Sequence, residues 1–554
     1  MYLRTSKRKN RDGTEVRYLQ LAHNEWDADA GQSVVRVIYS FGREDQVDRD
    51  GIARLISSLS RALPAGEAMA ASAGDGLAFV ESRPMGAAYV LDGLWRRLGI
   101  DKTLSELLDG RKLDARAERV LLALVANRAI DPSSKLAATA WVAERVAIDG
   151  LDDVDADACY RAMDGLLEIE GELAEAVYWS VADLLNLEVD LLFFDTTSTY
   201  FEIETADDPA KGETVGFRTY GHSKDHRPDL PQVIIGMAVT RTGIPIRVWC
   251  WPGNTNDSAL IRQVKDELKA WRLGRVVWVA DRGFTSAENR RYLQRAGGNY
   301  IVGEKLRGGA TEADAALARQ GRYHRVAGNL ELKEVVIDDG VMRDRFVICR
   351  NPDQAERDQA VRDNLLAQLA DAIDGSDKLS RTARSELAGS LPAGLRRFLR
   401  RTPAGLLRVD QAAVRAEERL DGKFLLRTSD PTLSAEDIAL GYKQLLEVER
   451  GWRDMKSTLE LRPVFHRLEH RIRAHVVLCW LALLLIRVAE TATGDTWRNL
   501  RHELDRMHLG TFTGAAGTMK RRTATTAAQA AILRALDLAE PREFSELRPA
   551  HPAA

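Results

Sequence analysis

The chain has 554 residues, of which 45% are hydrophobic and 29% are charged, with a formal net charge of -3 at pH 7. This length exceeds what one hydrophobic core supports, so several domains are expected, and the composition excludes a disordered or fibrous chain. The four scattered cysteines form no CxxC pair, which argues against a structural zinc site or a disulfide framework and favours a reducing compartment.

Neither a signal peptide nor a membrane span is predicted. The first 13 residues are polar and basic, with no apolar run behind them. The most apolar stretch, Val476 to Ile486, is shorter than the roughly 20 residues that a membrane span needs. We therefore predict a buried core helix there, no membrane partner and a cytoplasmic location.

The chain begins with a predicted β-rich region, because residues 16–26 and 33–42 are rich in β-branched and aromatic side chains. An Ala- and Gly-rich stretch at 64–76 has the composition of a linker. The following residues are mainly helical by hydrophobic period, with a break and restart at Asp131-Pro132-Ser133.

Residues 189–306 predict alternating elements in the order strand, strand, strand, helix, strand, helix, strand. These elements fall at 191–194, 233–239, 244–251, 256–270, 276–280, a helix begun by a Thr285/Glu288 capping box, and 300–302. Asp195 ends the first strand and Asp281 follows the fourth. An RNase H-like fold has this order, with its first and fourth strands adjacent and a carboxylate on each. We therefore predict an α/β fold whose core is a mixed five-stranded sheet, with the two aspartates side by side.

The rest of the chain extends this plan. Residues 307–430 mix strand-like and charged helical pieces, which predicts a β-containing insertion, and helices resume from Ser434. The predicted domains are a β-rich start with its linker, a helical region, the first part of the core, the insertion, the second part of the core and a basic tail, at 1–75, 76–188, 189–306, 307–430, 431–490 and 491–554.

The second part of the core contains the candidate third acid. Tyr442, Glu449 and Lys456 are seven residues apart, so at ~100° per residue they form one stripe along a helix, whereas Glu447 and Asp454 lie on other faces. Three carboxylates are the set that holds two divalent cations about 4 Å apart for a displacement at phosphorus. Mg²⁺ or Mn²⁺ suits such oxygen ligands. Asp195, Asp281 and Glu449 are thus predicted as catalytic metal ligands.

These motifs resemble those of the DDE transposases of bacterial insertion sequences, in the branch with a Tyr-x2-Arg-x3-Glu-x6-Lys signature. Tyr442, Glu449 and Lys456 match this signature, and Leu445 stands where the family has arginine. The segments DTTSTYF from Asp195 and DRGF from Asp281 look like the family's first two acid motifs. Arg453, one turn beyond Glu449, is our candidate substitute for the missing arginine.

The resemblance implies a transposase that binds the terminal inverted repeats of its element, cleaves there and joins the 3′-OH to target DNA, using two Mg²⁺ or Mn²⁺ ions. It implies double-stranded DNA as partner, a homodimer on DNA, association with the bacterial nucleoid, and residues 76–188 as a candidate DNA-binding region. The predicted DNA contacts are Tyr442, Arg453, Lys456, Arg462, His466, Arg471 and Arg473. Residues 307–430 contain no Trp, so the inserted tryptophan with which some relatives trap a base is not expected.

Other interpretations stay open at this point. An RNase H-like nuclease without strand transfer would lack terminal inverted repeats around its reading frame. A transposase-derived, non-catalytic DNA-binding protein would have no reason to keep three carboxylates together. Basic clusters such as Arg396/Arg397/Arg400/Arg401 suit phosphate, although each alone is more often solvated surface. His222 and His226 are four apart, but nearby prolines predict a loop rather than a metal-binding helix.

Overall fold

The structure is a computed structural model that describes residues 1–10, 14–27, 31–60, 77–111, 113, 115–184, 191–210, 212, 214–271, 276–308, 311–338, 343–514 and 517–549. The predicted linker at 64–76 lies outside the described residues. The chain divides into two compact units: the first comprises Met1–Ser82, His508–Ala524 and Arg542–Ala554, and the second Arg83–Met507 and Thr525–Pro541.

The first unit is rich in antiparallel strands. The two strands predicted near the start are confirmed as β2 (Glu15–Asp27) and β3 (Gln32–Arg43), and β1 (Tyr2–Lys9) completes a three-stranded sheet. Helix α1 spans Arg49–Ser60. A four-stranded sheet of order β18-β17-β16-β4 contains strands from both ends of the chain: β4 (Ala78–Pro84), β16 (His508–Gly514), β17 (Gly517–Arg522) and β18 (Phe544–Pro549).

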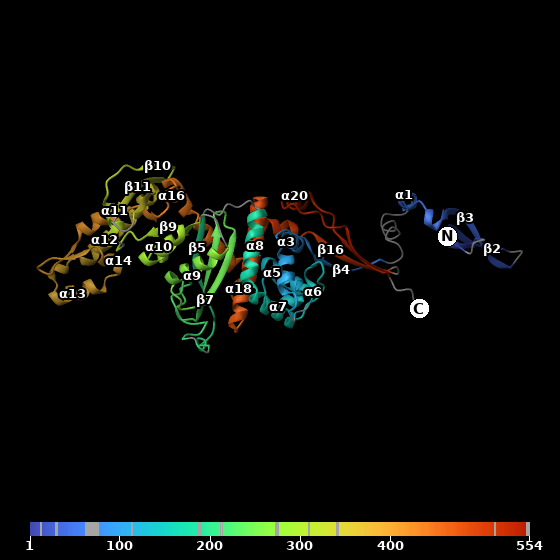
Figure 1. Ribbon diagram of the computed structural model, residues 1–554, viewed down its shortest axis with the longest axis horizontal. Coiled ribbons are helices and arrows are strands. Elements are labelled where there is room, and N and C mark those ends of the chain that lie inside the picture. The colour runs from blue at the N-terminus through green and yellow to red at the C-terminus, as the bar shows by residue number, and fades with distance from the viewer. Residues whose placement is uncertain are drawn as a thin grey trace. The chain divides into compact units, whose positions relative to one another are not determined.

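The second unit begins with helices that pack around one central helix, α18 (Glu469–Thr493), which contacts α3, α5 and α7 (Figure 1). The helices before the large sheet are α3 (Gly86–Arg97), α4 (Ile100–Leu108), α5 (Ala117–Ile130), α6 (Lys135–Glu144), α7 (Ala156–Glu168) and α8 (Glu170–Leu184). Among the described helices, α18 alone has the length and hydropathy of a membrane span, but its apolar window is 94% buried inside the protein. The predicted core helix is therefore confirmed.

A nine-stranded mixed sheet of order β10-β11-β12-β15-β9-β8-β5-β6-β7 forms the second part of this unit. Its strands are β5 (Leu191–Tyr200), β6 (Gln232–Thr240), β7 (Pro245–Pro252), β8 (Val277–Ala280), β9 (Asn299–Glu304), β10 (His324–Ala327), β11 (Leu330–Asp338), β12 (Arg343–Arg350) and β15 (Lys423–Thr428). The predicted element order from β5 to β9 is confirmed, as are the β6–β7 hairpin and the parallel pairing of β5 with β8.

Two expectations about this region are wrong. The sheet has nine strands rather than five, because the strands of the insertion continue it: β15 pairs with β9 and β12 pairs with β15. Helix α10 (Ala287–Gln294) is capped by Ser286, whose side chain accepts a hydrogen bond from Asn289 N, and not by the predicted Thr285/Glu288 box. The insertion also contains a helical module with its own small core. Its elements are α12 (Pro352–Ile373), α13 (Arg381–Ser390), α14 (Ala393–Arg396), β13 (Leu399–Arg401), β14 (Leu407–Val409) and α15 (Gln411–Glu418). Helix α11 (Thr311–Ala318) instead packs against β11 and β12 of the large sheet.

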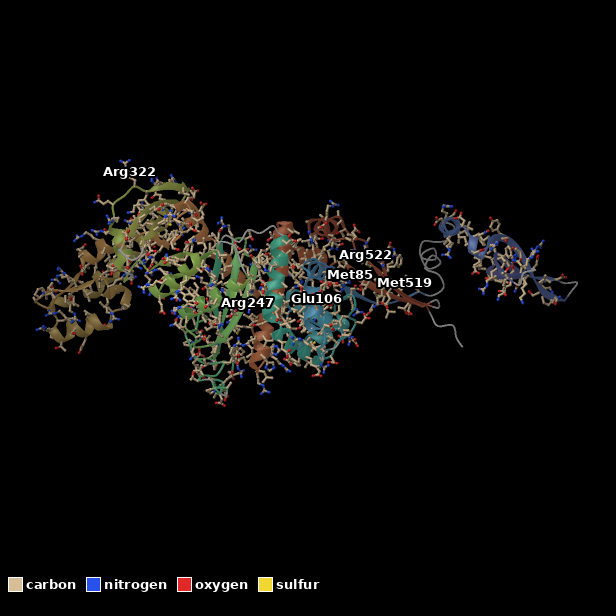
Figure 2. All side chains as sticks on the ribbon, viewed as in Figure 1. Met85, Glu106, Arg247, Arg322, Met519 and Arg522 are labelled. Atoms are coloured by element: carbon tan, nitrogen blue, oxygen red, sulfur yellow. The ribbon has the colours of Figure 1, made fainter. Side chains whose placement is uncertain are left out.

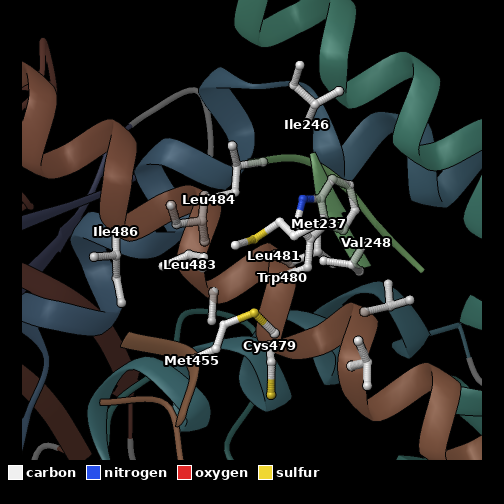
Figure 3. Packing of buried hydrophobic residues seen from close by; sticks show 14 of the residues in the cluster. Met237, Ile246, Val248, Met455, Cys479, Trp480, Leu481, Leu483, Leu484 and Ile486 are labelled. Carbon is white, nitrogen blue, oxygen red and sulfur yellow. The ribbon is translucent and has the colours of Figure 1, made fainter. Parts of the chain in front are cut away.

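The two faces of the sheet are covered by different helices, as the alternation of side chains along β7 shows. On one face, the indole nitrogens of Trp249 and Trp251 donate to Glu267 and Gln263 of α9 (Asp257–Ala270). Arg247, which is labelled in Figure 2, lies on the same face and pairs with Glu267. On the other face, Ile246 and Val248 of β7 and Met237 of β6 lie against side chains of α18 (Figure 3). Helix α17 (Leu446–Ser457) also lies on this second face and contacts β5 and β6.

Candidate active site

Two parallel strands bring Asp195 and Asp281 together. The register of β5 and β8 pairs Phe194 with Ala280, so the next residue on each strand is one of the two aspartates. Asp195 lies inside β5, and Asp281 leads from β8 into a short 3-10 turn at Arg282–Phe284. The predicted adjacency of these residues thus follows from the observed register.

The electrostatics of Asp195 reflect a crowded acidic site. The pKa of its carboxyl group is raised to about 6, mainly by burial and also by the negative charges of Asp281 and Asp257, against the lowering effect of the Lys224 ammonium. Lys224 Nζ lies 3.9 Å from Asp195 Oδ1 and 3.0 Å from Asp257 Oδ2. A buried carboxylate is costly without a counter-charge, and Lys224 supplies it.

Tyr442 holds the second aspartate. Its hydroxyl donates a hydrogen bond to Asp281 Oδ1 at 3.0 Å, and burial raises the pKa of the phenol well above its usual value, as does the charge of Asp281. The glycine at position 303 of β9 leaves space for this contact. Any larger residue there would clash, because its Cβ would lie 2.3 Å from the Tyr442 hydroxyl oxygen. Tyr442 therefore contacts the carboxylate, whereas the sequence predicted a DNA contact.

The predicted continuous helix from Tyr442 to Lys456 is wrong. Helix α16 (Ala435–Lys443) ends before Gln444, and α17 begins at Leu446. The backbone amides of Gln444 and Leu445 bond to carbonyls three residues earlier, which tightens the chain between the two helices. Tyr442 thus belongs to α16, and only Glu449 and Lys456 share one helix.

Glu449 is exposed at the first turn of α17, and it has no hydrogen-bond or ion-pair partner among the described residues. Within the part of the chain that the structure describes, no three His, Cys, Asp or Glu side chains are grouped in a way that could hold a metal ion. The buried face of α17 carries Val448, Gly451, Trp452 and Met455. At ~100° per residue, Glu449 and Lys456 lie together on one flank of that face.

Three contacts define the position of this flank. A Cβ at Gly441 would lie 2.8 Å from Leu191 of β5, and a Cβ at Gly451 would lie 2.6 Å from Met237, the register partner of Asp195. Lys456 Nζ donates to Thr197 Oγ1 at 2.7 Å. The chain from α16 through α17 therefore follows β5 from the level of Leu191 to that of Thr197, and Glu449 lies between these levels on the same flank as Lys456.

The alternative acids of α17 have other partners. Asp454 forms an ion pair with the buried Arg487 at 2.6 Å. Glu447 lies on the opposite flank, and its carboxylate packs against Gly243 in the β6–β7 turn. A Cβ added at Gly243 would lie 2.8 Å from Glu447 Oε2. Both acids therefore point away from the aspartates.

Lys456 and Arg462 converge on one carboxylate. Lys456 Nζ lies 2.9 Å from Asp225 Oδ1, and Arg462 Nη1 lies 3.1 Å from Asp225 Oδ2. The Arg462 guanidinium also lies over the Tyr200 ring at 4.8 Å. The structure thus brings two of the predicted DNA contacts next to β5. Sequence reasoning missed Lys224, Asp225 and Asp257, whose only signal was their charge in polar segments.

None of the remaining predicted contacts has a hydrogen bond or ion pair with the aspartates among the described residues. Arg453 is exposed on α17. Arg471 pairs with Asp164, and Arg473 pairs with Glu469 and donates to the Cys250 carbonyl. His466 is buried beside His475 and Tyr160. Burial and the nearby positive charge of Lys135 lower the pKa of His466 to about 4, so this imidazole is neutral at pH 7.

Comparison with known families identifies the chain. A family described as the transposase DDE domain matches residues 202–485, just over half of the 554 residues, and a family described as the N-terminal domain of IS1634 family transposases matches residues 3–71. The chain therefore belongs to the DDE transposases of insertion sequences. The first match includes Asp281 and Glu449, and Asp195 precedes it.

Similarity to solved structures is remote. The piggyBac transposase synaptic complex with hairpin DNA has 11% identity and a TM-score of 0.37, with 77% of this chain and 82% of that chain covered. The Mos1 transposase paired-end complex with the left transposon end has 15% identity and a TM-score of 0.14, with 36% and 57% covered. Neither likeness supports an inference about residues. No curated protein sequence matches the chain.

Proposed function

We propose that this transposase cleaves DNA at the ends of its own element and joins the 3′-OH ends to target DNA, with Asp195, Asp281 and Glu449 as its catalytic metal ligands. The observation that carries the proposal is the pairing of β5 with β8, which makes Asp195 and Asp281 the next residues after the last register pair, Phe194 with Ala280. The raised pKa of Asp195 supports it, because perturbed acids in one cluster are typical of catalytic sites.

An RNase H-like core is supported by connectivity. The antiparallel strands β5, β6 and β7 are followed by α9, then by β8 and β9, which lie parallel to β5 on its other side. In this arrangement the first and fourth strands are neighbours, with Asp195 in the middle of β5 and Asp281 directly after β8. The strands of the insertion then extend the sheet beyond β9 without separating the two aspartates.

The donor set fits Mg²⁺ or Mn²⁺. Two carboxylates with excess negative charge offer the oxygen ligands that these ions prefer, and the Lys224 ammonium already balances part of that charge. When bound, such ions supply activation of the attacking oxygen and stabilisation of the leaving oxygen at phosphorus. Tyr442 orients Asp281 through its hydrogen bond.

Glu449 is the proposed third ligand. It lies on the α17 flank that carries Lys456, at a level between Leu191 and Thr197 of β5. Its side chain has no competing partner among the described residues, whereas Asp454 is paired with Arg487. An exposed, unpaired glutamate can turn toward a bound cation without breaking an existing ion pair.

The proposed DNA contacts are Lys456, Arg462 and Arg453. The first two are already gathered beside β5, and Arg453 lies one turn after Glu449 on an exposed position. We propose the Tyr-Arg-Glu-Lys branch for this chain, with Tyr442 as a positioning residue for Asp281. His466, Arg471 and Arg473 are left out of the proposed contacts, because each is buried or bonded elsewhere.

The proposed partners are double-stranded DNA at the element ends and in the target, bound by a homodimer in the bacterial cytoplasm, with residues 76–188 contributing DNA contacts. The test is incubation of the protein with Mg²⁺ and DNA that carries the sequences flanking its reading frame. We expect cleavage at both element ends and products joined to target DNA. Cleavage without joined products would support the nuclease interpretation instead.

A further inference from the structure

The loop that follows the first acid motif carries charges opposite to those of the site that it touches. Residues 220–231 leave and rejoin the fold at one point, where the backbones of Thr219 and Gln232 exchange two hydrogen bonds of 3.1 and 2.9 Å. A Cβ at Gly253 would lie 2.3 Å from the Thr219 carbonyl oxygen and 2.0 Å from that of Gln232, so this base is tightly packed. The loop therefore has a fixed base and a polar tip.

The tip lies along the edge of β5 that β8 leaves unpaired. Strand β8 pairs with β5 only as far as Phe194, so the next residues of β5 have no partner strand on that side. Lys224 occupies this edge: its backbone amide donates to Ser198 Oγ at 2.9 Å and its ammonium donates to the Thr196 carbonyl at 2.7 Å. Its charge lies 3.9 Å from Asp195 Oδ1. A lysine thus provides positive charge beside the proposed metal ligand.

The next residue provides the complementary anion. The two oxygens of Asp225 contact Lys456 Nζ at 2.9 Å and Arg462 Nη1 at 3.1 Å. A phosphodiester presents two unesterified oxygens to its donors in a similar way. The side chains of Lys456 and Arg462 are 18% and 27% exposed, so solvent still reaches both cations. Asp225 therefore lies where a DNA phosphate between these two residues would lie.

The backbone after Asp225 is held in an uncommon conformation. His226 has a φ of 58°, in the left-handed region that non-glycine residues adopt infrequently. Such a conformation persists when surrounding contacts fix it. Here the amide of His226 donates to the Ser223 carbonyl and the amide of Arg227 donates to Ser223 Oγ, so the tip has a defined backbone conformation that presents Asp225 to the two cations.

We propose that the Lys224–Asp225 tip closes the DNA site of the free protein, with Asp225 in the place of a phosphate on Lys456 and Arg462, and that DNA binding displaces the tip. This inference rests on the proposed function, because it takes Lys456 and Arg462 as phosphate contacts. It assigns to loop 220–231 the role of an internal competitor of DNA. If Asp225 instead positioned the two cations for DNA, its replacement would weaken DNA binding rather than strengthen it.

The test is the affinity of Asp225→Asn for a fluorescent DNA duplex, measured by anisotropy in EDTA so that no cleavage occurs. We expect binding about tenfold tighter than wild type, which corresponds to about 1.4 kcal/mol. Asp208→Asn is the matched control, because it removes the same charge from an exposed position in the same connection; we expect it to change affinity by less than about twofold. In a Lys456→Ala, Arg462→Ala background, Asp225→Asn should have no more effect than the control.

An equal or lower affinity of Asp225→Asn, with an unchanged melting temperature, would overturn the inference. If this variant fails to fold, hydrogen exchange of the wild-type protein decides the question. The amide of Lys224 should exchange faster with DNA than without it, since its bond to Ser198 is lost when the tip leaves; slower exchange would refute displacement. A wild-type protein that binds no DNA would instead refute the proposed function.

Discussion

The two halves of the candidate site are built differently. Asp195 lies within β5 and Asp281 directly follows β8, so sheet register fixes their positions, and Lys224 and Tyr442 lie beside their carboxylate oxygens. Glu449 lies at the first turn of an exposed helix and has no partner among the described residues. A largely buried acid such as Asp195 needs a compensating partner before a cation arrives, whereas a solvated acid such as Glu449 needs none. The sheet thus holds two of the proposed ligands in place, and the helix leaves the proposed third free to move.

The largest effect is expected at the preassembled half. Asp281→Ala removes one proposed metal ligand and leaves the basic side chains in place. We expect cleavage in Mg²⁺ to fall by at least about 10²–10³-fold, the loss that follows removal of one transition-state stabiliser, while affinity for the element end is kept. Gel assays of cleavage and binding check both quantities. The control is Glu288→Ala, which removes an exposed acid of α10 and should cleave DNA at the wild-type rate. Cleavage at the wild-type rate by Asp281→Ala would show that Asp281 has only a structural role in the turn.

The helix-borne half predicts a loss of activity without a loss of stability. Glu449→Gln should reduce cleavage by about 10²-fold or more and change the free energy of unfolding by less than about 0.5 kcal/mol. Asp454→Asn should do the reverse, because it leaves the buried Arg487 with one ion pair fewer, at a cost of about 1–2 kcal/mol. Thermal melts and cleavage rates of the two variants separate these effects. If Glu449→Gln cleaved DNA normally and Glu447→Gln did not, the third acid would be Glu447 rather than Glu449.

The contrast between buried and exposed groups extends to the histidines near α18. His466 has a pKa lowered to about 4, first by burial and then by the charge of Lys135. Because its folded pKa lies below the unfolded value near 6.5, the unfolded chain binds more protons between these pH values. Stability is therefore complete above about pH 6.5 and falls as the pH approaches 4, by about 3 kcal/mol from this group.

Chemical denaturation at several pH values measures this loss. His466→Asn should flatten the profile between pH 6.5 and 4. His470→Asn is the control, since His470 is about half exposed beside Asp164 and should leave the profile unchanged. An unaltered acid slope in His466→Asn would show that His466 is protonated as readily in the folded protein as in the unfolded chain.

The smallest effect is expected at Lys456. If this ammonium contacts a phosphate in the complex, Lys456→Ala should lower the slope of log affinity against log salt by about one unit. Lys269→Ala removes an exposed lysine of α9 on the opposite face of the sheet and should keep the wild-type slope. A salt titration on a pre-cleaved end measures all three proteins. Equal slopes of log affinity against log salt in wild type and Lys456→Ala would show that Lys456 does not contact a DNA phosphate.

The parts of the fold that sequence predicted are those with a local signal. The apolar run before Asp195, the strand before Asp281 and the turn at Gly243 each reflect a short-range pattern, and their order was enough to predict adjacent strands. The extension of the sheet was missed because the pairing of β15 with β9 joins residues more than 100 positions apart. Strand-like pieces in an insertion do not reveal which edge they will join.

The candidate site shows the same limit. Spacing predicted that Glu449 and Lys456 share a flank, and both lie on α17. Helical period alone gave no sign of the break at Gln444, which separates Tyr442 from that helix, or of the hydrogen bond between Tyr442 and Asp281. Lys224 and Asp225 were missed because a polar loop has the same composition whether it is solvated or bonded to a site. The ion pair between Asp225 and Lys456 spans 231 residues, and no local pattern encodes such a contact.

The central claim is that Asp195, Asp281 and Glu449 form one metal site when DNA is bound. The most direct test is a structure of the protein on a DNA end with Ca²⁺, which occupies oxygen ligands and slows cleavage. The three carboxylates are expected to lie within about 8 Å of one another and to share the bound ions, with the Glu449 side chain turned from solvent toward β5. Ions held by Asp195 together with Asp257, while Glu449 stays in solvent, would contradict it.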